Sequence, residues 1–115
     1  MPKDDFIRVR HMLQSCQNLI SYTQNKTRAD LDKDPLLELA LVRLIEIIGE
    51  AASHISSEFQ SQFPAIPWIN IIGMRNRLIH AYYDIDNDRV WDTITDDIPP
   101  LITELQKILQ SEEKK

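Results

Sequence analysis

Residues 34–59 read DPLLELALVRLIEIIGEAASHISSEF, and this stretch decides the fold. Its apolar residues recur every three or four positions and cover most of a helical wheel, which is typical of a buried helix and not of a strand. Asp34 is suited to cap the first turn, and Pro35 fits the first helical position, where no N–H is needed. We therefore predict a helix from Pro35 to about Phe59, either central in a bundle or shared with a dimer interface.

One narrow polar stripe interrupts this apolar helix. Arg43, Glu46, Glu50 and then Ser53 and His54 follow one another at helical spacing. The stripe has two interpretations: a solvated edge with an Arg43–Glu46 ion pair, or a set of side chains that supports a functional group on a neighbouring helix. His54 alone is interpreted as a surface residue and not as a catalytic one.

The chain before this helix is expected to form another helix and a polar connection. Residues 4–24 carry apolar side chains at helical spacing. Residues 25–34 are polar, although Thr27 is suited to cap a short helical turn over residues 28–32. The single cysteine, Cys16, falls among apolar positions, so we expect a buried thiol without a disulfide partner.

Two more helices are expected in the second half of the chain. Pro67 starts the third helix, which is predicted to end near residues 82–83. After a polar turn, Asp86 or Asn87 is suited to cap the fourth helix. The prolines at positions 99–100 remove two backbone donors from this fourth helix and are expected to kink or break it.

The composition supports an all-α protein that forms one domain. The chain has 115 residues, two glycines and 43% apolar residues. A run of about 18 apolar residues is absent, and so is a signal peptide, which leads us to expect a reducing cytoplasmic location without membrane contact. We predict an up-and-down bundle of four main helices over residues 1–115, with a kinked or broken last helix.

The charge of the chain argues against a role as a general nucleic-acid-coating protein. The formal net charge is −5. Residues 1–30 carry five Lys or Arg against three Asp, a balance of +2, whereas residues 31–115 carry eight against fifteen Asp or Glu, a balance of −7. Any binding of an anionic substrate is therefore expected to be local.

Residues 75–83 read RNRLIHAYY and concentrate the groups that can do chemistry. Arg75 presents planar donors suited to a phosphate, and His80 can exchange a proton near neutral pH. These two groups suffice in principle to cleave RNA, whose 2′-hydroxyl is an internal nucleophile. On one continuous helix they lie about 140° apart. Either the helix ends near His80, or two copies of the stretch face each other across a two-fold axis.

The spacing of Arg75 and His80 is by itself a weak signal and favours a structural role. In that interpretation Arg75 pairs with an acidic residue such as Glu46, and His80 is an interior histidine with satisfied hydrogen bonds. Tyr82 and Tyr83 are then packing aromatics.

Metal and cofactor sites are not predicted. Asp84, Asp86 and Asp88 alternate like part of a calcium loop, but the glycine and the terminal glutamate of such a loop are missing. The Gly-Ser and paired aspartates with which a stand-alone nucleotidyltransferase binds magnesium are missing as well.

The stretch from Arg75 to Tyr82 resembles the Arg-x4-His-x-Tyr motif of HEPN-domain ribonucleases, specifically the HepT toxins of HepT/MntA toxin–antitoxin pairs. The long motif, with Asn directly after Arg and Tyr two positions after His, is more specific than Arg-x4-His alone. The similarity covers essentially the whole chain. It extends to Arg43-x2-Glu46-x2-Gly49-Glu50-Ala51, Pro67-Trp68, Val90-Trp91 and Ile98-Pro99-Pro100-Leu101.

This resemblance implies a HEPN-like homodimer whose two motifs form a composite cleft. It implies metal-independent endoribonuclease activity on cellular RNA, with no cofactor. Arg75 and His80 take the catalytic places, Asn76 takes a supporting polar one, and Arg43 with Glu46 supports them from the neighbouring helix.

The resemblance also implies a neutralising partner, a small nucleotidyltransferase antitoxin of the MntA type. This partner transfers AMP from ATP to the motif tyrosine, here Tyr82, next to a second phenol at Tyr83. AMP on Tyr82 would place phosphates beside Arg75 and His80 and so block RNA. The competing hypothesis is a non-catalytic helical module that binds a nucleotide or serves only as the partner of a nucleotidyltransferase.

Overall fold

The computed structural model describes residues 2–81 and 84–113; for Pro2, His80, Ala81 and Glu113 it describes the backbone without the side chain. The elements are α1 (Pro2–Thr23), α2 (Arg28–Lys33), α3 (Pro35–Ser53), α4 (Ser57–Gln62), α5 (Trp68–Ile72), α6 (Met74–Leu78), β1 (Ile79–Ala81), β2 (Asp84–Ile85), α7 (Asn87–Asp92), the π-helix η1 (Thr93–Asp97) and α8 (Ile98–Glu113). Within the described ranges, no helix is both long and apolar enough to cross a membrane.

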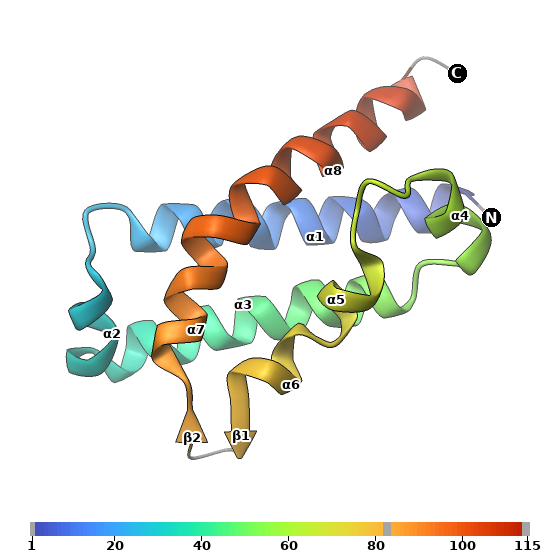
Figure 1. Ribbon diagram of the computed structural model, residues 1–115. Coiled ribbons are helices and arrows are strands. Elements are labelled where there is room, and N and C mark those ends of the chain that lie inside the picture. The colour runs from blue at the N-terminus through green and yellow to red at the C-terminus, as the bar shows by residue number, and fades with distance from the viewer. Residues whose placement is uncertain (1, 82–83, 114–115) are drawn as a thin grey trace.

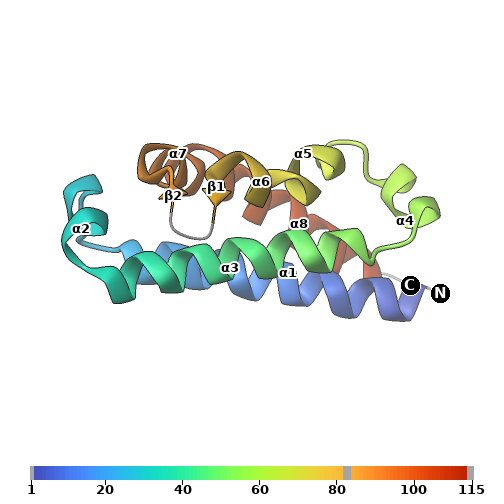
Figure 2. The same cartoon turned by 90° about the horizontal axis from the view of Figure 1, so that it is seen from below.

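Helices α1 and α3 lie side by side in opposite directions and form one layer of the molecule (Figure 2). Helices α5, α6 and α7 pack on one side of α3, and α8 packs against α1. If α5 with α6 and α7 with α8 are each taken as one segment, the chain runs through the bundle four times in alternating directions (Figure 1). The predicted all-α bundle of four main helical segments is confirmed.

The helices enclose one apolar core. Helix α1 contributes a stripe at the predicted helical spacing: Phe6, Val9, Met12, Cys16 and Leu19. The predicted buried thiol is confirmed, because the side chain of Cys16 is fully buried. Burial raises the pKa of the Cys16 thiol to about 12, since a thiolate is poorly solvated in the core.

The predicted helix starts are confirmed where they depend on local hydrogen bonds. The Asp34 carboxylate accepts from the backbone N–H of Leu37 (3.1 Å) at the start of α3, with Pro35 at its first position. At the start of α2, the Asp30 carboxylate accepts from the backbone N–H of Thr27 (2.7 Å), which completes a capping box.

Helix α3 ends at Ser53, so the prediction that it continues to about Phe59 was wrong. The reason is a contact with the start of the chain. The buried carboxylate of Asp5 accepts hydrogen bonds from the backbone N–H (2.9 Å) and the hydroxyl (2.8 Å) of Ser56. Ser56 in turn caps α4, which directs Phe59 edge-to-face against Phe6 in the core.

The predicted kink in the last helix is confirmed and takes the form of one wider turn (Figure 1). Because Pro99 and Pro100 lack an N–H, the turn before them cannot form the regular α-helical bonds. The chain instead forms η1, in which the N–H of Ile98 donates to the carbonyl of Thr93, five residues back. Both prolines then lie in the first turn of α8, where a missing N–H does no harm.

Gly49 allows α5 to approach the backbone of α3 closely. A Cβ atom at this position would lie 3.2 Å from the carbonyl oxygen of Ile71 and 3.4 Å from that of Ile72. Gly49 is buried and lies three residues after Glu46 on α3. The glycine therefore determines how near α5, and the chain that follows it, can come to Glu46.

We expect Gly49→Ala to lower the free energy of unfolding by about 1–2 kcal/mol, because α5 would have to move away from α3 by a few tenths of an ångström. Urea unfolding followed by circular dichroism measures this loss. Gly73→Ala is the matched control, because its added Cβ would lie at an ordinary 3.5 Å from the Ile69 carbonyl. Equal stability of the two variants would contradict the expectation.

Candidate active site

The predicted third helix is present as two short helices, and it ends earlier than predicted. Gly73 separates α5 from α6, and its N–H donates to the carbonyl of Ile69 (3.1 Å). Helix α6 ends at Leu78, not near Tyr82 or Tyr83, because Ile79 has an extended backbone with φ −123° and ψ 107°. The five-residue helix α6 thus presents Arg75, Asn76 and Arg77 on one exposed turn.

A two-stranded antiparallel ribbon follows α6 directly, although no strand was predicted. In the ribbon Ile79 of β1 lies opposite Ile85 of β2, and both side chains pack against the core. The N–H of Asp86 donates to the carbonyl of Leu78 (2.8 Å) and closes the ribbon at its base. These contacts explain why the helix stops: the β-branched side chains are buried in the extended conformation that they favour.

His80 is part of β1, so the separation of about 140° on a continuous helix does not apply to it. Of the two geometries that the sequence left open, the structure contains the first, in which the helix ends before His80. The side chain of His80 lies outside the described part of the chain, as do Tyr82 and Tyr83, so their assigned roles stay predictions.

The guanidinium of Arg75 is held by Glu46 of α3. The Nε atom of Arg75 donates to Oε2 of Glu46 over 2.6 Å, and Nη1 of Arg43 lies 3.9 Å from Oε1 of the same carboxylate. Arg75 is 46% exposed and Glu46 is 27% exposed, so the pair adds at most about 1 kcal/mol to stability. Among the side chains that the structure describes, none besides Glu46 accepts a hydrogen bond from Arg75.

The polar stripe of α3 and the Arg75 stretch therefore meet at Glu46. This ion pair fits both interpretations that the sequence allowed, the structural pairing of Arg75 and the support of a functional Arg75 by Arg43 and Glu46. The neighbouring Arg77 points elsewhere, because its Nη2 atom donates to the carbonyl of Asn70 (2.9 Å). Asn76 is exposed on the same turn.

A polar clamp anchors the end of the ribbon to α2 and α3. It consists of Arg28, Asp32, Glu38, Asn87 and Asp88. The Asn87 amide donates to Glu38 Oε2 (2.6 Å) and to Asp32 Oδ1 (3.2 Å). Nε of Arg28 donates to Asp88 Oδ1 (2.7 Å), and its Nη1 lies 3.1 Å from Asp32. The clamp fixes the start of α7, which Asp86 caps as predicted by accepting from the N–H of Arg89 (3.1 Å).

The hydrogen bond from Asn87, together with the nearby Arg28, lowers the pKa of the Asp32 carboxyl. Sequence reasoning identified Asn87 as a possible helix cap and did not predict this clamp. Its members are up to 60 residues apart, and no local pattern connects them.

Over the described ranges, no group of three or more His, Cys, Asp or Glu side chains is arranged to hold a metal ion. The candidate site consists of Arg75, Asn76, Glu46 and Arg43 at the place where α6 becomes β1. Its chemistry is that of hydrogen-bond donors at a solvent-exposed helix end, which suits a phosphate.

The model of a family described as "Ribonuclease HepT-like" matches residues 12–108, a span that contains both Glu46 and the Arg75–His80 stretch. The chain belongs to this ribonuclease HepT-like family. Membership confirms the family that the motif predicted, and it confirms the predicted class of enzyme, a nuclease that acts on RNA.

Similar relatives carry names that agree with the HepT-like family. A "Putative RNase" of Caldanaerobacter subterraneus subsp. tengcongensis is 40% identical over 104 residues, which are 90% of this chain and 93% of that protein. A "Putative RNase" of Methanocaldococcus jannaschii is 33% identical over 116 residues, or 100% of this chain and 96% of that protein. A "Probable ribonuclease HepT" of Thermococcus cleftensis is 40% identical over 75 residues, or 65% and 68% of the two chains. No solved structure matches the chain at a significant level.

The clamp is expected to weaken in acid. The pKa of Asp32 is lower in the folded chain, so its stabilisation is complete above the ordinary aspartate pKa of about 4 and is lost as the pH falls through the lowered value. The stability difference between wild type and Asp32→Asn should therefore stay constant between about pH 6 and about pH 4 and shrink below about pH 4 in urea unfolding. Asp92→Asn, which changes an exposed aspartate of α7, should show no such change. A pH-independent difference for Asp32→Asn would contradict the expectation.

Proposed function

We propose that the chain is a metal-independent endoribonuclease toxin in which Arg75 binds a phosphate of RNA and His80 transfers the proton. The observation that carries the proposal is the position of Arg75, which lies three residues, or about one helical turn, before the end of α6. Glu46 holds its Nε atom, and the terminal nitrogens remain to donate to a phosphate. Because β1 follows at once, His80 is reached along an extended backbone and not around a helix.

The proposed reaction needs no protein nucleophile. His80 takes the proton of the RNA 2′-hydroxyl, the oxygen attacks the adjacent phosphorus, and the bond to the 5′-oxygen breaks to leave a cyclic phosphate. The leaving 5′-oxygen takes up a proton from water, and Arg75 stabilises the negative charge that builds up on the phosphoryl oxygens. Asn76 supplies a further polar group on the same turn, and Arg43 with Glu46 keeps Arg75 in place.

We propose further that two copies of this single-domain chain assemble so that their motifs share one cleft. Large apolar side chains are exposed around the site. Leu39 (58% exposed) lies two turns before Glu46 on the same face of α3, and Ile69 (85%) and Ile72 (38%) lie on α5 just before Arg75. Burial of these side chains against a second copy would favour a homodimer.

The regulation that we propose acts on Tyr82. A nucleotidyltransferase antitoxin of the MntA type would transfer AMP to this phenol in the cytoplasm. Tyr82 follows β1 and precedes β2 in the sequence, two residues after His80. Phosphates attached there would compete with RNA for the terminal nitrogens of Arg75.

Purified Arg75→Ala and His80→Ala are each expected to cleave RNA at least about 100-fold more slowly than wild type in EDTA, because each loses charge stabilisation or proton transfer. Arg77→Ala is the matched control: it removes a neighbouring arginine that is bound to a backbone carbonyl, and it should keep most of the activity. Activity of Arg75→Ala or His80→Ala equal to that of Arg77→Ala would reject the assigned roles.

Mixing the two inactive variants tests the shared cleft. If each site takes Arg75 from one protomer and His80 from the other, random reassortment should restore roughly a quarter of wild-type activity, because half of the dimers carry one intact site. No recovery, with proven exchange of subunits, would place both residues of a site in one protomer.

Incubation with the antitoxin, ATP and magnesium should add AMP to wild type and to Tyr83→Phe, but not to Tyr82→Phe, as measured by intact-protein mass spectrometry. The modified protein should lose RNA cleavage because the added phosphates occupy Arg75. Addition of AMP to Tyr82→Phe would move the acceptor to another residue.

A further inference from the structure

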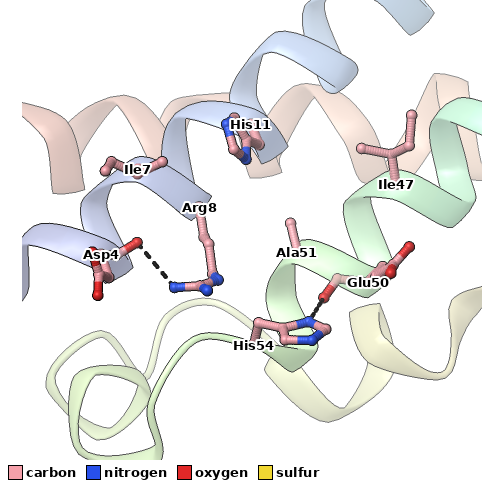
Figure 3. A pocket seen from close by; sticks show the side chains of 8 residues that line it. All are labelled: Asp4, Ile7, Arg8, His11, Ile47, Glu50, Ala51 and His54. Atoms are coloured by element: carbon pink, nitrogen blue, oxygen red, sulfur yellow. Dashed lines mark hydrogen bonds between the residues drawn. The ribbon is translucent and has the colours of Figure 1, made fainter. Parts of the chain in front are cut away.

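A groove between α1 and α3 shares helix α3 with the candidate site and contains none of its residues. Its volume is about 380 Å³. Its floor is apolar and is formed by Ile7 of α1 with Ile47 and Ala51 of α3 (Figure 3). Three side chains with nitrogen donors border this floor: Arg8, His11 and His54.

The donors of the groove are only partly used. Nη1 of Arg8 donates to the backbone carbonyl of Asp4 over a long 3.4 Å, and Arg8 has no ion-pair partner in the described part of the molecule. Nδ1 of His54 lies 2.9 Å from the carbonyl of Glu50. If Nδ1 donates in this hydrogen bond, Nε2 on the opposite side of the ring is left for a ligand, and it donates to a phosphate when both ring nitrogens carry a proton.

The two carboxylates that border the groove do not occupy its centre. Figure 3 shows the side chains of Arg8 and His54 bordering the same part of the groove, with Ala51 beside them, whereas the carboxylates of Asp4 and Glu50 point away at opposite ends. The middle of the groove therefore offers donors above an apolar surface. That combination fits a phosphate together with the ribose or base attached to it.

Helix α3 connects this groove to the candidate site. Glu46, which holds Arg75, directly precedes Ile47 of the groove floor. Glu50 and His54 lie four and eight residues further on, or about 6 and 12 Å along the helix axis. A strand of RNA bound at Arg75 can thus reach the groove with its neighbouring nucleotides. The first 30 residues, which supply Arg8 and His11, are also the part of this acidic chain with a positive balance of charge.

We infer that the α1–α3 groove is a second RNA subsite, which binds a phosphate flanking the one that is cleaved. This inference rests on the proposed ribonuclease function and adds to it the path of the substrate. Arg8 and His54 contact the flanking phosphodiester, and the apolar floor contacts its nucleoside. RNA that extends beyond the cleaved bond should therefore bind more tightly than RNA that ends there.

Fluorescence anisotropy with 2′-O-methyl RNA tests the inference, because this RNA binds without being cleaved. Arg8→Gln is expected to raise the Kd of an eight-nucleotide strand about three- to fivefold, the effect of one exposed charge contact. The slope of log Kd against log salt should fall by about 0.7 for the one lost phosphate contact. A two-nucleotide RNA, which reaches only Arg75, should bind wild type and variant alike.

Arg10→Gln is the matched control. It removes the same charge two residues along α1, where Arg10 is exposed and paired with Glu112 of α8. Equal effects of Arg8→Gln and Arg10→Gln, or an equal effect of Arg8→Gln on both RNA lengths, would overturn the subsite. So would dissociation of the oligomer by Arg8→Gln in sedimentation, which would make the groove a subunit contact.

Cleavage of unmodified RNA separates this inference from the proposed function. If wild type cleaves and Arg8→Gln leaves KM for the long RNA unchanged, the subsite is wrong and the ribonuclease stands. If wild type does not cleave but binds long RNA in an Arg8-dependent way, the proposed function fails and the groove remains an RNA site.

Discussion

The close contact between the backbone of α5 and Gly49 of α3 is the constraint on which the candidate site depends. Without a side chain at position 49, the carbonyls of Ile71 and Ile72 lie against α3, and the chain that leaves α5 begins its next helix beside Glu46. Arg75 then meets Glu46 from a helix of only five residues, which is too short to be stable alone. The ion pair is weak because it is exposed. The packing of the helices therefore determines where Arg75 lies, and the Glu46 carboxylate only orients its side chain.

The sequence was sufficient to predict features that depend on neighbours a few residues apart. The caps at Asp34 and Thr27 and the apolar stripe of α1 are of this kind, and so is the distortion before Pro99 and Pro100. The ends of α3 and α6 were not predictable in this way. Helix α3 stops where Asp5, 51 residues away, binds Ser56, and α6 stops where the ribbon buries Ile79 and Ile85. Periodicity continues through both points, so it carries no sign of either end.

The candidate site was likewise predictable where it depends on residues close in the sequence, and less so where it depends on residues far apart. Arg75, Asn76 and His80 were identified from a motif within one short stretch, and Glu46 from a stripe on another helix. The contact between Arg75 and Glu46, which are 29 residues apart, was anticipated, and it fits both the structural and the functional interpretation. The clamp around Asn87 was missed because Arg28, Asp32 and Asp88 look like ordinary surface charges until α2 is placed beside α7. The groove between α1 and α3 likewise required the packing of two helices, because no local pattern connects Arg8 and His11 of α1 with His54 at the end of α3.

The wide turn of η1 changes the rotation of α8, the helix that follows it, about the helix axis. A π turn takes up one residue more than an α-helical turn, which rotates everything after it by about 100° relative to everything before it. Val90 before this turn, Ile94 within it, and Ile98, Leu105 and Ile108 after it are all buried in the same core. The number of residues between Asp92 and Ile98 is therefore as constrained as their identity. A gain or loss of one residue there would turn the apolar side of α8 away from α1, even though every individual helix could still form.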